Sequence, residues 1–175
     1  MSQSYEIDMC HGPLFGKIIR FSIPLMLSGI LQLLFNAADI IVVGRFVGST
    51  ALAAVGSTSS LINLLINLFI GFSVGANVLV ARFHGAGRDD EVNETVHTAI
   101  TLSMISGIFL LIFGVTVTRT LLIWMGSPDD VLDQSSLYLK IYFLAMPATL
   151  LYNFGSSILR AVGDTKRPLF YLVTA

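Results

Sequence analysis

Charge is scarce in this sequence. Asp, Glu, Lys and Arg make up 12% of its 175 residues, about half the share that soluble domains carry. Hydrophobic residues account for 54%, and the mean hydropathy is +0.80. The hydrophobic core of so short a chain does not account for so few charged residues. The composition therefore excludes a soluble enzyme and indicates contact with lipid. The net charge of −1 gives no electrostatic reason to expect a nucleic-acid partner.

Cysteine is almost absent, since Cys10 is the single one. One thiol excludes an internal disulfide framework and a cysteine-based zinc site, and we expect Cys10 to be an inert thiol. His97 has only Glu94 at ligand spacing on its face of a helix, and a single pair of candidate ligands argues against a metal site there. The sequence also lacks the nucleophile–base and metal constellations of a membrane enzyme. We therefore expect no catalytic residues, no metal, no cofactor and no enzymatic activity.

Four long stretches contain no charged residue. A helix of about 20 apolar residues spans the ~30 Å hydrocarbon core of a bilayer, so each stretch predicts one spanning helix. The fold class is therefore an all-α polytopic membrane protein with four transmembrane helices and the start of a fifth. The charge-free stretches are 21–38, 46–81, 95–118 and 141–159. We place the helices near 18–44, 52–81, 95–118 and 136–160, with the fifth at 168–175.

The fifth helix begins at Pro168 and is cut off after seven further residues. A helix that stops in hydrocarbon leaves backbone carbonyls unsatisfied, so we interpret the chain as the N-terminal part of a longer protein. A cleaved signal peptide is the alternative for the first span. It fits poorly, because the apolar run exceeds the roughly 7–15 residues of such a segment.

Lys and Arg are distributed unequally between the two ends of the predicted helices. Seven lie on the side of the N-terminus, and three lie on or near the opposite side. The positive-inside rule therefore places the N-terminus in the cytoplasm. The seven are Lys17, Arg20, Arg82, Arg88, Arg160, Lys166 and Arg167, and the three are Arg45, Arg119 and Lys140.

Polar residues form stripes along three of the predicted helices. In the first helix, Ser28, Gln32, Asn36 and Asp39 follow one another at helical spacing, which places them on one face. Lipid-facing positions cannot carry such groups cheaply, so we expect the stripes to turn toward a shared, wet interior. The second helix repeats Ser59, Asn63, Asn67, Gly71 and Gly75 every four residues, and the fourth aligns Tyr138, Tyr142, Ala145, Thr149 and Asn153 around Pro147.

Helix packing is the main alternative for the stripe of the second helix. Asn side chains commonly hydrogen-bond a neighbouring membrane helix, and Gly71-x-x-x-Gly75 is typical of close helix approach. We favour packing over substrate contact for Asn63, Asn67 and the two glycines. Pro147 either bends its helix for packing alone or marks a hinge.

Asp39 is the one acid within an apolar span. A charge there costs several kcal/mol, so the carboxylate has three stable states: protonated, bound to a cation, or paired with a basic group. Arg45 is the nearest base, but its side chain is expected to extend to the interface. We therefore prefer a proton or a cation, and a functional role is the default for an intramembrane acid.

Three segments carry a resemblance to a known family. They are "IPLMLSGILQLLFNAADIIVVGRFVGSTALAAVG", "GFSVGANVLVARFHGAGRDDEVNETV" and "LRAVGDTKRP", and residues 14–175 resemble the N-terminal part of a multidrug and toxic compound extrusion (MATE) transporter. The resemblance implies twelve helices in two six-helix lobes, of which residues 1–175 form an incomplete N-terminal lobe. Helices 5–12 and the lipid bilayer are then its partners. Members export cationic or amphipathic compounds in exchange for Na⁺ or H⁺, which are coupling ions rather than cofactors.

The resemblance also implies roles for individual residues. The helix-1 acid of the family corresponds to Asp39, which would bind the cation or proton. Weaker candidates for lining a cavity that takes small organic cations are Gln32, Asn36, Asn63, Asn67, Tyr138 and Asn153. The expected location is a bacterial plasma (inner) membrane. Two alternatives are a lipid-linked oligosaccharide flippase of the related superfamily, which should need a basic cavity, and a non-transporting membrane subunit in which Asp39 only joins helices.

Overall fold

The computed structural model describes residue 7 and residues 14–174, so Cys10 lies outside the described residues. All regular elements in this part of the chain are helices, which confirms the predicted all-α fold. They are α1 (Leu14–Val42), the π-helix η1 (Val43–Val47), α2 (Ser49–Gly85), α3 (Asp89–Trp124), α4 (Asp129–Ala161) and α5 (Lys166–Thr174).

Three of the described helices are long and apolar enough to cross a membrane. These candidate spans are Phe15–Phe46, Leu52–Gly85 and Asp89–Trp124. The fourth span predicted at 136–160 is not among them, although α4 is 33 residues long. α4 packs against both α2 and α3 and buries four serines, Ser135, Ser136, Ser156 and Ser157. A helix covered by protein on several sides can carry more polar residues than one that faces lipid.

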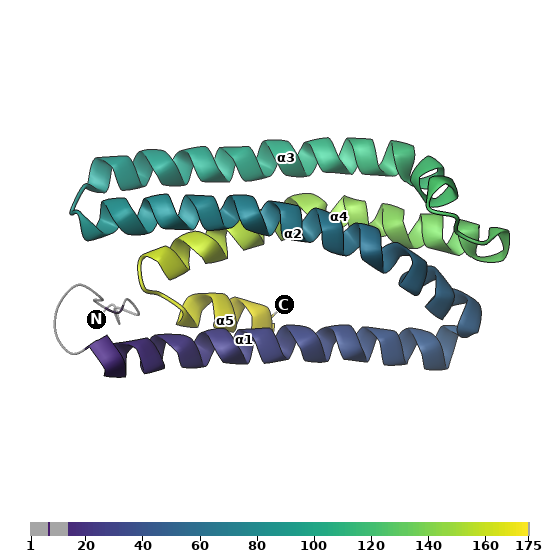
Figure 1. The fold of residues 1–175 in the computed structure, drawn as a ribbon, viewed down its shortest axis with the longest axis horizontal. Helices are drawn as coiled ribbons and strands as arrows, with labels where there is room; N and C mark the ends of the chain where they lie inside the picture. Colours follow the sequence, from purple (N-terminus) through teal and green to yellow (C-terminus); the bar gives the residue numbers. More distant parts are fainter. Residues whose placement is uncertain (1–6, 8–13, 175) are drawn as a thin grey trace.

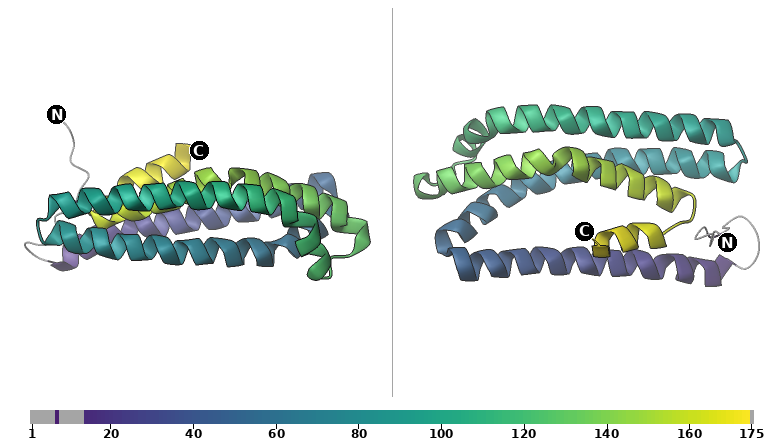
Figure 2. Two further views of the ribbon diagram at one scale, coloured as in Figure 1. Left: turned by 90° about the horizontal axis from the view of Figure 1, so that it is seen from above. Right: turned by 180° about the vertical axis from the view of Figure 1, so that it is seen from behind.

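The helices form two groups. α2, α3 and α4 pack against one another, with the most extensive contact between α3 and α4, whereas α1 packs mainly against α5 and η1. Figures 1 and 2 show α1 running alongside this three-helix group, with the short α5 between α1 and α4. The lobe therefore consists of a packed α2–α3–α4 layer and a more loosely attached first helix.

Two glycines allow α3 and α4 to approach closely. A Cβ added at Gly107 would lie 2.6 Å from the Cα of Pro147, and one added at Gly114 would overlap the ring of Phe143. Phe143 is 1% exposed and belongs to the main hydrophobic core. The sequence reading assigned close packing to Gly71 and Gly75 instead. An added Cβ at either of these meets nothing within 4 Å.

Hydrogen bonds between side chains and backbone join α2 to α4. The amide of Asn77 donates to the carbonyl of Ser157 at 2.6 Å, and the Ser157 hydroxyl donates to the carbonyl of Ser73 at 2.9 Å. Ser57 and Ser135 add a hydroxyl contact of 3.2 Å further along the same two helices. These bonds satisfy polar groups that would be costly in hydrocarbon, and they hold the two helices in one register.

The helices extend beyond the charge-free stretches. α3 begins at Asp89 rather than near 95, so Asn93 and Glu94 lie within the helix. Three acids, Asp89, Asp90 and Glu91, occupy its first turn, where they interact favourably with the positive end of the helix dipole. A prediction from hydropathy alone ends each helix where the polar residues begin. The predicted helices were therefore too short.

Candidate functional site

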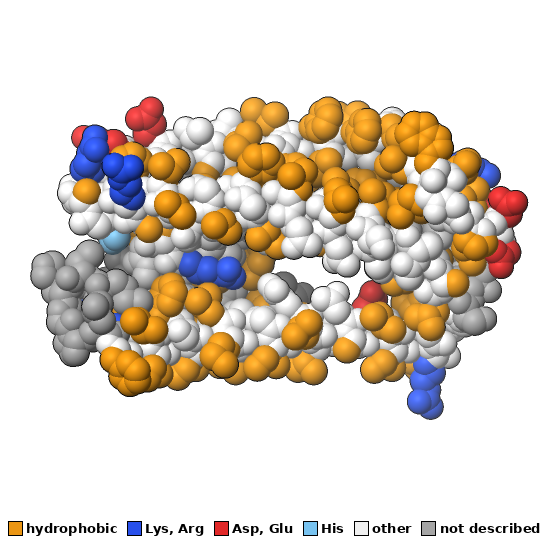
Figure 3. All heavy atoms as spheres, in the orientation of Figure 1, with side chains coloured by type: hydrophobic (Ala, Val, Ile, Leu, Met, Phe, Trp, Pro, Cys, Tyr) orange, Lys and Arg blue, Asp and Glu red, His pale blue; other side chains and the backbone are white. Residues whose placement is uncertain are grey.

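Asp39 lies three residues before the end of α1 and faces α4. Its carboxylate and the Tyr138 hydroxyl are close enough to interact electrostatically. α1 and α4 are not a principal packing pair, so this contact crosses the space between the first helix and the packed layer. Figure 3 shows that the molecule is hollowed between these two parts. The structure therefore brings together two of the residues that the sequence singled out, which lie 99 positions apart.

Asp39 is exposed in the described chain, whereas the sequence reading expected it to be shielded from bulk water. The ion pairs among the described residues are Arg88–Glu91, Arg119–Asp133 and Arg167–Asp164. None of them includes Asp39, so pairing with Arg45 is not realised and the carboxylate is available to a mobile cation.

The other polar residues of the α1 stripe differ in their exposure to solvent. Ser28 is buried, and its hydroxyl donates to the carbonyl of Pro24 at 2.8 Å. Gln32 and Asn36 are exposed, and the Asn36 amide donates to the Gln32 carbonyl at 3.0 Å. Both amides therefore retain the capacity to bind a further polar group. They stand within about two turns of Asp39 on the same face.

The candidate residues of α2 do not pack as expected. Asn63 and Asn67 are exposed, and the Asn67 amide donates to the Asn63 carbonyl of its own helix at 2.7 Å. The face of α2 that meets the core carries Ile62, Ile66 and Phe69 instead. Packing was the preferred interpretation of Asn63 and Asn67, and no contact among the described residues supports it.

The two candidates on α4 lie far apart. Tyr138 and Asn153 are both half-buried, but 15 residues separate them, which corresponds to about 22 Å along a helix. Tyr138 packs against the main core and also interacts electrostatically with Asp39. Asn153 is therefore not part of the Asp39 site, and any role in lining a cavity would be at the other end of α4.

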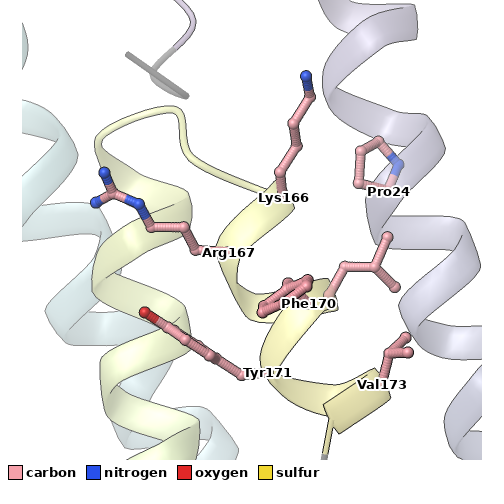
Figure 4. Close-up of a pocket in the computed structure, with 7 residues that line it drawn as sticks. Pro24, Lys166, Arg167, Phe170, Tyr171 and Val173 are labelled. Atoms are coloured by element: carbon pink, nitrogen blue, oxygen red, sulfur yellow. The ribbon is translucent and has the colours of Figure 1, made fainter. Parts of the chain in front are cut away.

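A pocket of about 660 Å³ lies between α1 and α5, and no pattern in the sequence predicted it. Most of its lining is apolar, with two basic side chains at the start of α5. Figure 4 shows Lys166 extending beside α1, whereas Arg167 and Tyr171 point toward α4. Its lining residues are Pro24, Lys166, Arg167, Leu169, Phe170, Tyr171 and Val173. Lys166 and Arg167 were noticed in the sequence only as markers of orientation, because their common pocket depends on how α5 folds back onto α1.

These features define a class first: an integral membrane protein with several spanning helices and an acid facing an internal opening. Comparison with known proteins then identifies the family. The MatE family model matches residues 24–175, so the chain belongs to the MatE family of multidrug and toxic compound extrusion proteins.

Named relatives and solved structures agree with this family. The chain is similar to the probable multidrug resistance protein YoeA of Bacillus subtilis, with 35% identity over 155 residues, covering 89% of this chain and 34% of YoeA. It is 24% identical over 151 residues to the multidrug export protein MepA of Staphylococcus aureus (strain MRSA252), covering 86% of this chain and 34% of MepA. A crystal structure of MATE in complex with MaL6 matches 99% of this chain and 38% of that one, with 27% identity and a TM-score of 0.89. The chain thus spans about a third of the length of these relatives.

Proposed function

We propose that this chain forms part of a secondary active antiporter, which exports cationic or amphipathic compounds in exchange for Na⁺ or H⁺. The observation that carries the proposal is the position of Asp39: an acid in an apolar helix, facing an internal opening and free of any ion pair among the described residues. Family membership and the multidrug names of the relatives support the type of substrate.

Asp39 would couple the two movements through competition. In the complete transporter within a bilayer, the Asp39 carboxylate would be shielded from bulk water and would be stable when a single positive charge neutralises it, whether that charge is a proton, Na⁺ or an organic cation. Arrival of one of these favours departure of another, which is the requirement for exchange. The Tyr138 hydroxyl would donate a hydrogen bond to the charged carboxylate. This bond would lower the free energy of the interval in which neither a proton nor a cation is bound to Asp39. Gln32 and Asn36 would supply adjacent polar contacts to the substrate.

The proposed location is a bacterial inner membrane with the N-terminus in the cytoplasm. Seven Lys and Arg residues on the N-terminal side against three on or near the opposite side support this orientation. The remaining helices of the transporter would complete the lobe around α1 and supply the second lobe.

The test is Asp39→Asn in the full transporter, purified and reconstituted into liposomes. Export of ethidium, an organic cation, would be followed by fluorescence under an imposed Na⁺ or H⁺ gradient. We expect gradient-driven transport to fall at least tenfold, because the amide cannot bind a proton or a cation as a carboxylate does. Asp133→Asn is the matched control, because Asp133 is 86% exposed beside Arg119. We expect this variant to transport normally. Undiminished coupled transport by Asp39→Asn would refute the proposal.

A further inference from the structure

The pocket between α1 and α5 is charged at one end and apolar along the rest. Lys166 and Arg167 occupy the first two positions of α5, and each begins a row of side chains at helical spacing. Phe170 and Val173 follow Lys166, and Tyr171 follows Arg167. All five residues line the pocket (Figure 4). The pocket therefore changes along α5 from two cationic groups to an aliphatic and aromatic surface.

Asp164 fixes the position of this charged end. The residue is fully buried, and its Oδ1 accepts hydrogen bonds from the backbone N–H groups of Lys166 and Arg167, both at 3.1 Å. The carboxylate therefore caps the start of α5. On the α4 side, the Tyr152 hydroxyl donates to the carbonyl of Pro168 at 3.3 Å. The backbone that carries both cationic side chains is thus anchored to α4.

Positive charge predominates around the charged end of the pocket. The start of α1 and the α4–α5 turn lie at the same end of the lobe (Figure 1), and their residues 14–21 and 160–168 include five basic residues and one acid. The acid is Asp164, which pairs with Arg167. Lys17 is half-buried and lies about two turns before the pocket-lining proline of α1. These two segments therefore favour a negatively charged ligand.

We propose that the pocket between α1 and α5 binds a phospholipid with an anionic headgroup, which lies at Lys166 and Arg167 while an acyl chain lies along the apolar wall. Phe170 and Val173 form part of this wall and are 65% and 61% exposed, so a chain can reach them from the bilayer. Basic pockets between membrane helices bind anionic headgroups. In the orientation proposed above, the headgroup belongs to the cytoplasmic leaflet. The binding itself is independent of the proposed antiport.

Two other occupants match the pocket less well. An exported organic cation would be repelled by the two basic side chains. A small anion such as phosphate would be attracted by them, but it would leave the apolar wall uncovered, and burial of apolar surface is a main source of affinity. A molecule with a negative head and a hydrocarbon tail matches both ends of the pocket, and such molecules surround an integral membrane protein.

The first experiment measures which ligand binds. The full transporter, delipidated in detergent, would be titrated with phosphatidylglycerol or with phosphatidylcholine of the same acyl chains, and bound lipid would be followed by native mass spectrometry. We expect phosphatidylglycerol to bind at least about fivefold more tightly, because its net negative charge is attracted by the basic end of the pocket. Inorganic phosphate should bind more weakly than either lipid. Equal affinities for the two lipids, or phosphate binding as tight as that of phosphatidylglycerol, would overturn the proposal.

The second experiment locates the headgroup. The double variant Lys166→Gln, Arg167→Gln removes both cationic groups of the pocket. The matched control is Arg119→Gln, Lys140→Gln, which removes the same charge from two exposed residues outside the pocket. We expect the affinity for phosphatidylglycerol to fall at least about fivefold in the first variant and to stay unchanged in the second. Equal affinities of the two variants would refute the headgroup position.

The third experiment locates the acyl chain and leaves every charge in place. Val173→Trp fills the apolar part of the pocket, whereas Val78→Trp adds the same bulk at a valine of α2 that is 58% exposed and lies outside the pocket. We expect only Val173→Trp to weaken the binding of phosphatidylglycerol, by several-fold. Equal binding by the two tryptophan variants would overturn the lipid assignment. None of these measurements involves transport, so their outcome is separate from that of Asp39→Asn.

Discussion

Replacing Gly114 by alanine tests how closely α3 and α4 are packed. The added methyl group would overlap the ring of Phe143, which is almost completely buried between the helices. Either the ring leaves its position or the two helices move apart. Inserting a methyl group into a well-packed core costs about 1–3 kcal/mol. The contact at Gly114 is closer than van der Waals contact allows, so we expect the upper half of this range.

Gly71→Ala is the reference variant because it makes the same chemical change in a helix with open space around the glycine. Alanine favours helix over glycine by about 1 kcal/mol, and this gain is common to both variants. It therefore cancels in the comparison, and the difference between Gly114→Ala and Gly71→Ala equals the packing cost of about 1–3 kcal/mol.

The assay is unfolding of the full transporter in detergent micelles with increasing SDS, followed by circular dichroism. Gly114→Ala should unfold at a lower SDS fraction than the unchanged protein, and Gly71→Ala at the same or a higher one. Phe143→Leu should be less harmful in the Gly114→Ala background than alone, because the smaller side chain leaves room for the methyl group. Equal unfolding midpoints for Gly114→Ala and Gly71→Ala would show that the reasoning about this interface is wrong.

Two further predictions concern the same stability assay. Asn77→Ala removes the amide that bonds α2 to the Ser157 carbonyl of α4 and should lower the free energy of unfolding by about 0.6–1.7 kcal/mol. Asn67→Ala removes an amide that bonds only its own helix and should lower it by less. The reverse order would contradict the role of Asn77 in joining α2 to α4. Asp164→Ala removes the buried cap of α5 and should cost about 1–2 kcal/mol, whereas Asp133→Ala at an exposed ion pair should leave the unfolding midpoint unchanged.

The course of the helices could be read from the sequence because lipid imposes a simple rule. A spanning helix must be long and apolar, and charged residues mark its ends. The same rule failed where protein rather than lipid surrounds the chain. α4 buries several serines and falls outside the set of apolar spans, and the first turns of α3 and α4 are built from acids that a hydropathy reading assigns to loops.

The candidate site was only partly predictable for a different reason. Helical spacing placed Gln32, Asn36 and Asp39 on one face, since spacing within one helix is a property of the sequence. Contacts between helices depend on which partner each face meets. Gly71-x-x-x-Gly75 has the spacing of a packing motif but no partner in this part of the chain, whereas Gly114, which has no glycine four positions away, meets Phe143.

The pairing of α1 with α5 has a consequence for synthesis of the protein. About 120 residues separate the end of α1 from the start of α5, and a ribosome adds them at about 5–20 residues per second. The first helix therefore enters the bilayer and waits roughly 6–24 s for its main neighbour, while the three helices between them are made and can already assemble. During this interval the part of α1 that α5 later contacts has lipid, water or the insertion machinery around it, so its own protein does not yet cover it.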